Sequence, residues 1–535
     1  MSGLKVSNIR KLHFWAMKGA VRFTENIIER PLVVTAVLAG HIALFLSLPV
    51  SPLLDLPNHI VRCWAIKEQL IGHQVGFVFD FMFIPYICGD LLLAAVLSIM
   101  SWQAAEMLWT VVCYLAMPLG VWAYLKSRNA DAGTSKLIML FAAYASANWF
   151  FLSGFANFCL GIGLAFSAAA SWERLYREGD RAKAYSNAVC IGLVLACYLT
   201  HLAAFLFAGI MIGAVTVARV LGGRESFISA LCSALPFALI LAAHVMLQPD
   251  APDMASVWQH RALWEKPLAV GAMYIRYNQA VDSILFATLA LGILTLAAWP
   301  TKSKQPLDLV QLGEDITVLI ALTAAYLVLP VKAAPAYGVD SRALPFMSVS
   351  AMLIAAAFIK SRGELRLRRA NFLLSSIAVV SLLYLVPFMR AHSNFVAAVD
   401  QAWRSIPPGE RVLPVATVPD IGRIQPSLHR PELYAIENPG FVPYVFSRDT
   451  SGSQIEYFHY RYRYPYAPHI KWYLNNEQIR WDELSPIYSF ILITKPYEPE
   501  RLAELNYRLV YENDAAAVLK LEQGSAGSGS TAAAS

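Results

Sequence analysis

The chain has 535 residues, of which 57% are hydrophobic and only 15% are charged. An average soluble domain carries about 25% charged residues, and the apolar residues here are gathered into long runs. The net charge of +6 comes from short basic clusters between those runs. This argues against a nucleic-acid-binding surface and favours the topology signals of a membrane protein. We therefore predict a polytopic α-helical membrane protein.

Eleven apolar runs follow a charged N-terminal segment, residues 1–30. That segment is too long and too charged for a cleaved signal peptide, so we expect a cytoplasmic basic segment. Most runs are close to the roughly 20 residues that a helix needs to cross a membrane, which predicts about 11 spans. The runs are 31–49, 82–99, 103–125, 136–152, 155–172, 187–220, 227–247, 282–299, 315–330, 343–360 and 371–388.

The basic clusters between the runs set the expected topology, because cytoplasmic loops of membrane proteins are rich in lysine and arginine. All clusters can be cytoplasmic only if run 187–220 crosses twice, turning near residues 200–201. The stretch 82–125 must then cross an odd number of times. We therefore expect 82–99 to be re-entrant or juxtamembrane; the alternative is that one basic loop breaks the rule. Either way the N-terminus lies inside and residue 390 lies outside.

These runs define a transmembrane domain, 31–389, with a first outer loop at 50–81, and a C-terminal domain, 390–522. Strand–helix–strand alternation in that domain predicts a small extracytoplasmic α/β domain. The last residues, 523–535, form a low-complexity flexible tail. The architecture and the lack of eukaryotic retention signals indicate a multi-pass protein of a bacterial inner (plasma) membrane with a periplasmic C-terminal domain. Helices are expected at 394–406 and 497–506, and strands at 412–418, 488–495, 507–512 and 515–522.

The first outer loop carries the sequence SPLLDLPNHIVRCW, residues 51–64. Pro57 fixes its own backbone and pushes the preceding residue out of the α region, which holds Asp55 at the membrane–water boundary. A carboxylate held there is suited to accept a proton from a hydroxyl group. The alternative is an ordinary solvated loop acid or a helix cap. His59 is a second catalytic candidate. The alternative role for His59 is packing or hydrogen bonding within the loop.

Three stretches together resemble the GT-C superfamily of integral membrane glycosyltransferases: DLPNH around Asp55, FIPYICGDLLLA (83–94) and FLSGFANF (151–158). The resemblance implies many membrane helices and a catalytic acid in the first external loop. It also implies transfer of a sugar from a polyprenyl-phosphate carrier to an envelope acceptor, which is lipopolysaccharide, exopolysaccharide or protein. Many members carry a second acid where this chain has Asn157. An acidic metal-binding pair is therefore in doubt, and a divalent cation (Mg or Mn) is left open.

The resemblance implies that Asp55 is the general base and that the lipid phosphate leaves the anomeric carbon with inversion. The leaving phosphate gains negative charge and needs cations nearby. Arg342 is the preferred candidate, because arginine grips phosphate oxygens in a fork; its other readings are a salt bridge with Asp340 and a lipid headgroup contact. The remaining candidates for binding substrate or phosphate are Lys332, Arg276, Asp90, His201 and Asn157.

Other functions stay open at this point. A polysaccharide polymerase or ligase would also use a lipid-linked donor, but its large outer loop usually lies between late helices. A transporter would need paired ionisable groups at mid-membrane and internal repeats, whereas the acids here cluster near the outer boundaries. A non-catalytic scaffold remains if Asp55 is dispensable. The stretch 429–446 carries Glu432 and Glu437, and we expect an ordered loop or helix–strand join there without a catalytic triad.

Overall fold

The computed structural model describes most of the chain, and its contacts divide the chain into two compact units. The helical unit comprises Met1–Ser47, Phe83–Gly89 and Leu108–Phe388. The sheet unit comprises Leu48–Met82, Asp90–Met107 and Met389–Ser535. The expected segment 1–30, the expected helix 497–506 and the tail 523–535 lie outside the described residues. The structure describes residues 32–177, 180–247, 259–300, 306–333, 336–415, 424–425, 427–447, 457–461, 484, 487–495 and 507–522.

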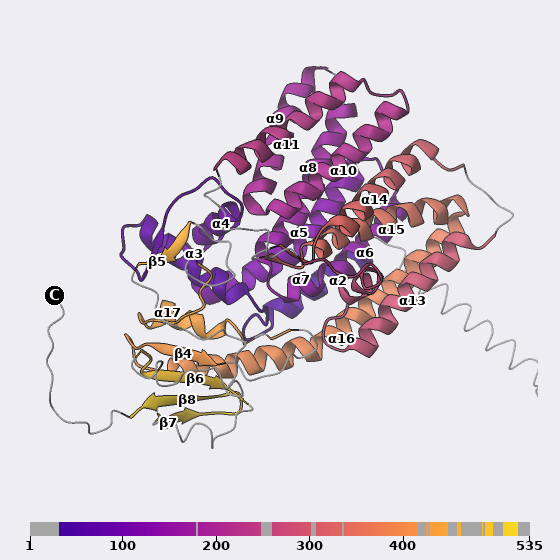
Figure 1. Ribbon diagram of the computed structural model, residues 1–535. Helices are drawn as coiled ribbons and strands as arrows, with labels where there is room; N and C mark the ends of the chain where they lie inside the picture. Colours follow the sequence, from indigo (N-terminus) through magenta and orange to yellow (C-terminus); the bar gives the residue numbers. More distant parts are fainter. Residues whose placement is uncertain are drawn as a thin grey trace, which may run out of the picture. The chain divides into compact units, whose positions relative to one another are not determined.

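The helical unit is a bundle in which consecutive packing contacts join α6 to α15, α15 to α14, α14 to α10, and α10 to α8 and α9 (Figure 1). Helix α16 continues from this unit into the sheet unit. The helices are α2 (Leu32–Leu46), α5 (Trp102–Ser127), α6 (Ala132–Ser146), α7 (Trp149–Leu152), α8 (Ala156–Arg177), α9 (Asp180–Thr200), α10 (Leu202–Leu221), α11 (Phe227–Leu247), α12 (Lys266–Ala272), α13 (Gln279–Ala298), α14 (Leu309–Val328), α15 (Leu344–Ser361) and α16 (Glu364–Arg404), with a 3-10 turn η2 (Asp340–Ala343) and two short paired strands, β2 (Lys332–Ala333) and β3 (Ala336–Tyr337).

Eight helices of the described residues are long and apolar enough to cross a membrane. Three further apolar helices are shorter, namely Leu32–Leu46, Ile87–Leu97 and Asn187–Thr200. The expected α-helical membrane protein is thus confirmed, whereas the expected number of about 11 spans is supported only for these eight. The three shorter apolar helices make up the difference between these numbers.

Two local expectations about the membrane runs agree with the helix boundaries. The run 187–220 contains two helices, α9 and α10, and the chain breaks between them at His201. His201 has an extended backbone, and its side chain accepts a hydrogen bond from the backbone N–H of Ala203 at the start of α10. The run 82–99 contains only the 11-residue helix α4 (Ile87–Leu97), which is too short to cross a bilayer.

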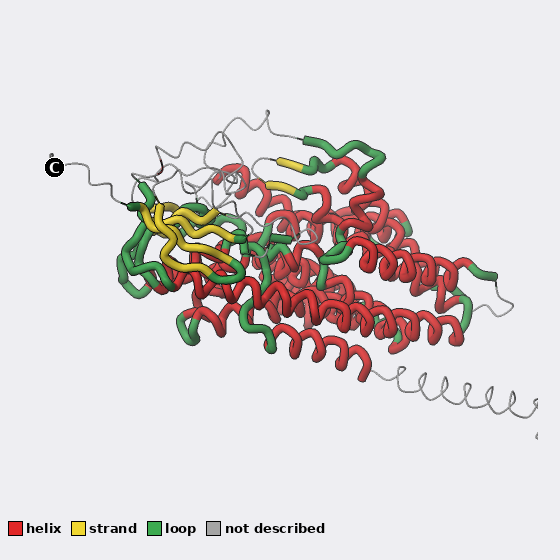
Figure 2. The backbone as a smooth tube through the Cα atoms, turned by 90° about the horizontal axis from the view of Figure 1, so that it is seen from below, coloured by secondary structure: helices red, strands yellow, loops and turns green. Residues whose placement is uncertain are grey.

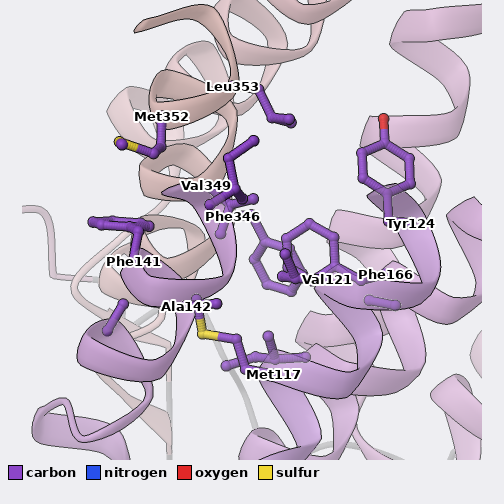
Figure 3. Packing of buried hydrophobic residues seen from close by; sticks show 14 of the residues in the cluster. Met117, Val121, Tyr124, Phe141, Ala142, Phe166, Phe346, Val349, Met352 and Leu353 are labelled. Atoms are coloured by element: carbon purple, nitrogen blue, oxygen red, sulfur yellow. The ribbon is translucent and has the colours of Figure 1, made fainter. Parts of the chain in front are cut away.

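Helices α5 and α8 approach each other closely because glycines face each other. A Cβ atom placed on Gly163 would lie 2.4 Å from the carbonyl oxygen of Ala116, and one on Gly120 would lie 2.4 Å from the carbonyl oxygen of Gly163. Small residues are the usual means of bringing membrane helices together. The same core continues to α15, where the rings of Phe166 and Phe346 stack at 5.5 Å (Figure 3).

The sheet unit is built around a four-stranded sheet in the order β4-β6-β8-β7, and its strands lie side by side in Figure 2. β4 and β6 are parallel, whereas β6–β8 and β8–β7 are antiparallel. All five residues of the central strand β6 are buried, as its uninterrupted apolar sequence requires. The small C-terminal sheet region is therefore confirmed. Its strands are β4 (Val412–Val415), β6 (Phe490–Thr494), β7 (Tyr507–Glu512) and β8 (Ala516–Leu521).

Segments far apart in the sequence complete the sheet unit. The segment 50–81, expected as the first outer loop, contains α3 (Leu56–Leu70) and β1 (Phe77–Phe79), and β1 pairs antiparallel with β5 (Phe458–Tyr460). The stretch after β4 contains the 3-10 turn η3 (Arg430–Leu433) and α17 (Tyr434–Glu437). Helix α3 packs against both η3 and α17. The segment 50–81 and the C-terminal part of the chain thus form one packed body.

The close α5–α8 contact predicts a strong preference for glycine at position 163. Gly163→Val drives a branched side chain into the backbone of α5, and we expect it to destabilise the protein by on the order of 1–3 kcal/mol. Thermal unfolding of the purified protein in detergent measures this as a lower melting temperature. Gly213→Val is the matched control, because nothing lies within 4 Å of a Cβ at that glycine. Equal melting temperatures for the two variants would contradict the packing argument.

Candidate active site

Asp55 occupies the N-cap position of α3, immediately before the helix that Pro57 helps to start. Its side chain makes no capping hydrogen bond to the helix and is only 13% exposed. Its Oδ1 atom lies 3.6 Å from Nε2 of His429, in the C-terminal part of the same unit. The alternative of a solvated loop acid is therefore not what the structure contains, because the carboxylate is nearly enclosed and faces an imidazole.

Two polar side chains contact the other nitrogen of that imidazole. Nδ1 of His429 lies 3.0 Å from Oε1 of Glu432 and 2.9 Å from Nδ2 of Asn58. Phe446 packs edge-on against the His429 ring, with 4.9 Å between centroids. Glu432 is fully buried. Asp55, His429 and Glu432 therefore form a row in which the imidazole lies between two carboxyl groups.

The turn η3 that carries Glu432, and that begins directly after His429, is held by a fully buried arginine. Arg430 binds Asp400 through two nitrogens, each 2.6 Å from a carboxylate oxygen, and it also binds Glu106. An arginine of this kind cannot be left unpaired without a large loss of stability. These two ion pairs therefore fix where His429 lies within the sheet unit.

A second buried ion pair lies about two helical turns from Asp55 along α3. Arg62 donates to both carboxylate oxygens of Asp90 at 2.5 and 2.9 Å, and the hydroxyl of Tyr457 donates to the same carboxylate at 2.6 Å. Nη2 of Arg62 is also 2.8 Å from Nδ1 of His59. His59 and Asp90, both expected near the site from the sequence, thus lie together in a hydrogen-bonded cluster that anchors α3.

The charges of these groups follow from burial and from their partners. Burial would raise the pKa of Asp90, but the adjacent Arg62 outweighs it and holds that pKa well below its ordinary value. Burial lowers the pKa of His59, and the neighbouring Asp90 offsets this only in part. Burial raises the pKa of Glu432, against the opposite effect of His429. Asp90 is therefore an ionised anchor, and Glu432 holds its proton more tightly than an exposed glutamate does.

In the helical unit, Arg342, His201 and Asn157 all contact the aromatic residue Tyr86. Arg342 hydrogen-bonds the Tyr86 side chain, and its guanidinium lies 5.8 Å from the centroid of the Phe158 ring. The His201 ring meets Tyr86 edge-on at 5.2 Å. Three residues predicted separately from the sequence are thus brought together around one tyrosine, which gives a cation with aromatic walls.

Tyr86 is held in an unusual backbone conformation with φ of +80°. A non-glycine residue at positive φ costs on the order of 1–3 kcal/mol and is found mostly at functional positions. The carbonyl of Tyr86 accepts a hydrogen bond from Nδ2 of Asn157 at 3.3 Å. A Cβ on Gly89 would lie 2.0 Å from Oδ1 of Asn157. The motif FIPYICGD therefore requires both its strained tyrosine and its glycine for this packing.

The other two predicted cations do not contact this cluster in any described interaction. Arg276 pairs with Asp282 at 2.7 Å and donates to Ser381 at 2.7 Å. Lys332 lies in β2, and its backbone pairs with Gln259. Asp340, expected as a partner for Arg342, makes ion pairs with Arg261 at 3.4 Å and Lys266 at 3.6 Å. These contacts favour structural roles for Arg276 and Asp340.

Among the described residues, no group of three or more histidine, cysteine, aspartate or glutamate side chains is arranged to hold a metal ion. Asn157, which stands where a second acid was considered, binds a backbone carbonyl through its amide.

Sequence reasoning missed His429, Asn58 and Arg62 as residues of this site, and it named Glu432 without giving it a role. His429 and Asn58 are separated by 371 positions, so no local spacing could have linked them. Arg62 could have been found from the sequence, because an acid such as Asp90 in an apolar run needs a cationic partner. The sequence predicted its partner Asp90 as a residue that binds substrate or phosphate, whereas the structure pairs Asp90 with Arg62.

Comparison with known proteins gives a structural relative. The fold is similar to that of ArnT from Cupriavidus metallidurans, in a crystal structure bound to undecaprenyl phosphate, with 11% identity and a TM-score of 0.55 over 93% of this chain and 99% of that one. The GT-C resemblance is thereby confirmed as a fold. ArnT in the apo state matches at 12% identity and a TM-score of 0.43, over 94% of this chain and 98% of that one. The arabinofuranosyltransferase AftD from Mycobacteria matches at 14% identity and a TM-score of 0.45, over 91% of this chain and 41% of that one.

Those last two likenesses are too weak to support an argument. No family model matches the sequence, and a search of curated proteins finds no match. The relation to ArnT therefore rests on the three-dimensional fold.

The Arg62–Asp90 pair predicts a pH-dependent loss of stability. Because the pKa of Asp90 is lowered on folding, its ionised form stabilises the folded state above the ordinary value of 3.8, and this stabilisation is lost as the pH falls below that value. Asp90→Asn leaves Arg62 buried without its counter-charge and is expected to cost about 3–5 kcal/mol at neutral pH. Thermal unfolding at several pH values compares the variant with the wild type. The difference should narrow in acid; a difference that is constant with pH would contradict the assignment.

Proposed function

We propose that the protein is a membrane glycosyltransferase that transfers a sugar from a polyprenyl-phosphate carrier to a hydroxyl group of an envelope acceptor. The acceptor is lipopolysaccharide, exopolysaccharide or protein. The protein would lie in a bacterial inner membrane with its N-terminus in the cytoplasm and residues 390–522 in the periplasm. Asp55 would be the general base of an inverting reaction.

The observation that carries this proposal is the likeness to ArnT over almost the whole length of both chains. That relative was solved with undecaprenyl phosphate, which is the group that leaves in the reaction proposed here. Fold alone does not define function, so the side chains must supply the chemistry. The nearly enclosed Asp55 beside His429 supplies a suitable base, and the cation at Tyr86 supplies a suitable anion-binding group.

The reaction needs one proton acceptor and one stabilised leaving group. The acceptor oxygen attacks the anomeric carbon, the bond from that carbon to the phosphate oxygen breaks, and the electron pair leaves with the phosphate. Asp55 would accept the hydroxyl proton as the new bond forms. A guanidinium can donate two hydrogen bonds to phosphate oxygens, and these bonds become stronger as negative charge develops on the oxygens. Arg342, with Tyr86 and His201 around it, is proposed for this second role.

Asp55→Asn tests the base. The asparagine keeps the size of the side chain but cannot accept the proton, so we expect turnover to fall by about 10²- to 10⁴-fold, with binding of undecaprenyl phosphate retained. The measurement is release of undecaprenyl phosphate, by mass spectrometry, from undecaprenyl-phosphate glucose, galactose, mannose and arabinose in the presence of bacterial envelope extract. Asp80→Asn is the matched control, since Asp80 belongs to the same unit and its side chain is 58% exposed.

The outcomes separate clearly. Loss of turnover in Asp55→Asn but not in Asp80→Asn supports the general base. Wild-type protein that releases undecaprenyl phosphate from none of the four donors contradicts the proposed function. An active Asp55→Asn variant would show that Asp55 is not the general base, and a transferase would then need another residue in that role.

Arg342→Gln tests the phosphate site. Losing the cation is expected to weaken binding of undecaprenyl phosphate by about tenfold or more, because charge-assisted hydrogen bonds contribute roughly 1.5–3 kcal/mol. Native mass spectrometry with undecaprenyl phosphate as the probe measures the affinity. Arg368→Gln is the control, because Arg368 also lies in the helical unit and its side chain is 55% exposed. Equal affinities for the two variants would place the phosphate elsewhere.

A further inference from the structure

In the row Asp55–His429–Glu432, the role of His429 depends on which of its two ring nitrogens carries the proton. Nδ1 of His429 lies within 3.0 Å of two groups, the amide nitrogen of Asn58 and a carboxyl oxygen of Glu432. A neutral imidazole carries its proton on only one nitrogen, and the hydrogen bonds of the other nitrogen decide which. The proton on His429 can therefore be located from its neighbours.

Asn58 decides the question because backbone groups fix its amide. The backbone N–H of Phe446 donates to Oδ1 of Asn58 at 2.6 Å, and Nδ2 donates to the carbonyl of Tyr444 at 3.0 Å. A backbone N–H is always a donor and a carbonyl always an acceptor, so the amide cannot be turned over without losing both bonds. Nδ2 thus presents an N–H to His429, and Nδ1 of that ring must be an acceptor.

Glu432 fits the same assignment. A carboxylate 3.0 Å from an accepting nitrogen would be repelled, whereas a protonated carboxyl group can donate to it. Glu432 is fully buried, and among the described residues its Oε2 atom has no hydrogen-bond partner, which disfavours a charge there. The raised pKa of Glu432 agrees with this. Both neighbours of Nδ1 are then donors, and the imidazole proton lies on Nε2.

We infer that His429 is a positioning residue for Asp55: its Nε2–H faces Oδ1 of Asp55 and orients that carboxylate for the proposed base role. The inference rests on the proposed function. The separation of 3.6 Å is longer than a hydrogen bond, as catalytic contacts often are before substrate binds. His429 gives up no proton in this scheme. Its Nε2–H points a fixed dipole at Asp55, and Asn58 and Glu432 orient the ring by donating to Nδ1 on its other side.

A pair of substitutions at His429 tests the donor. His429→Gln keeps an N–H that can reach Asp55, whereas His429→Leu removes it at similar size. We expect His429→Leu to lower kcat by on the order of 10²-fold, the effect of misplacing a reacting group, and His429→Gln to recover at least about tenfold of that loss, with KM changed little in both. The assay is undecaprenyl phosphate release from the four undecaprenyl-phosphate sugars. His459→Gln, at an ion-paired histidine of the same unit, is the control.

A second pair tests the tautomer itself. Asn58→Asp places a carboxylate at Nδ1, which draws the imidazole proton to that nitrogen and turns a bare lone pair toward Asp55. Asn58→Ala loses all three hydrogen bonds of the amide without reversing the tautomer. We expect kcat to be lower in Asn58→Asp than in Asn58→Ala, although a purely structural role predicts the opposite order.

The results distinguish failure of the inference from failure of the function. An inactive wild type overturns the proposed function, and the inference with it. A wild type whose activity depends on Asp55, together with a His429→Leu variant of unchanged kcat, overturns the inference alone. Equal losses in His429→Leu and His429→Gln, or a lower kcat in Asn58→Ala than in Asn58→Asp, also overturn it. Thermal unfolding of each variant verifies that the protein is folded.

Discussion

The sheet unit depends on the pairing of two arginines that are fully removed from water. Arg62 is satisfied by Asp90, and Arg430 by Asp400 and Glu106. Buried ion pairs add little net stability over apolar packing, but the loss of one partner is very costly. The pairs join α3, the residues around Asp90 and Glu106, and the C-terminal part of the unit, and separating these segments would leave a buried charge without its partner.

This arrangement explains why the candidate base lies where it does. Asp55 lies just before α3, yet the imidazole that faces it belongs to His429, about 370 positions later. One arginine lies on α3, which begins directly after Asp55, and the other lies in η3, which begins directly after His429. His429 is adjacent in sequence to Arg430, so the ion pairs that hold the turn also hold the imidazole. The orientation of a small catalytic group is thus fixed by charges that do not themselves react.

The sequence predicts the parts of this protein that depend on local patterns. Apolar runs marked the helices, the break near His201 followed from charge distribution, and the alternating strands of the last 130 residues predicted a small sheet. Asp55 and Arg342 were selected from their positions between runs. The sequence could not show that Asp90 belongs with Arg62 and Tyr457, or that His429 faces Asp55, because such pairings are set by tertiary packing and leave no periodic signal. The sequence also could not determine the number of membrane crossings, because an apolar run does not define where a helix ends.

The pairing of β1 with β5 joins residues separated by about 380 positions, and this has a consequence for synthesis. At roughly 5–20 residues per second, the ribosome needs tens of seconds to reach β5 after finishing β1. During that time the outer loop exists without its strand partner, and Glu106 exists without Arg430. The membrane helices are made in the interval. The β1–β5 pair therefore forms late in synthesis, and a nascent chain that stops short of β5 leaves β1 without its strand partner.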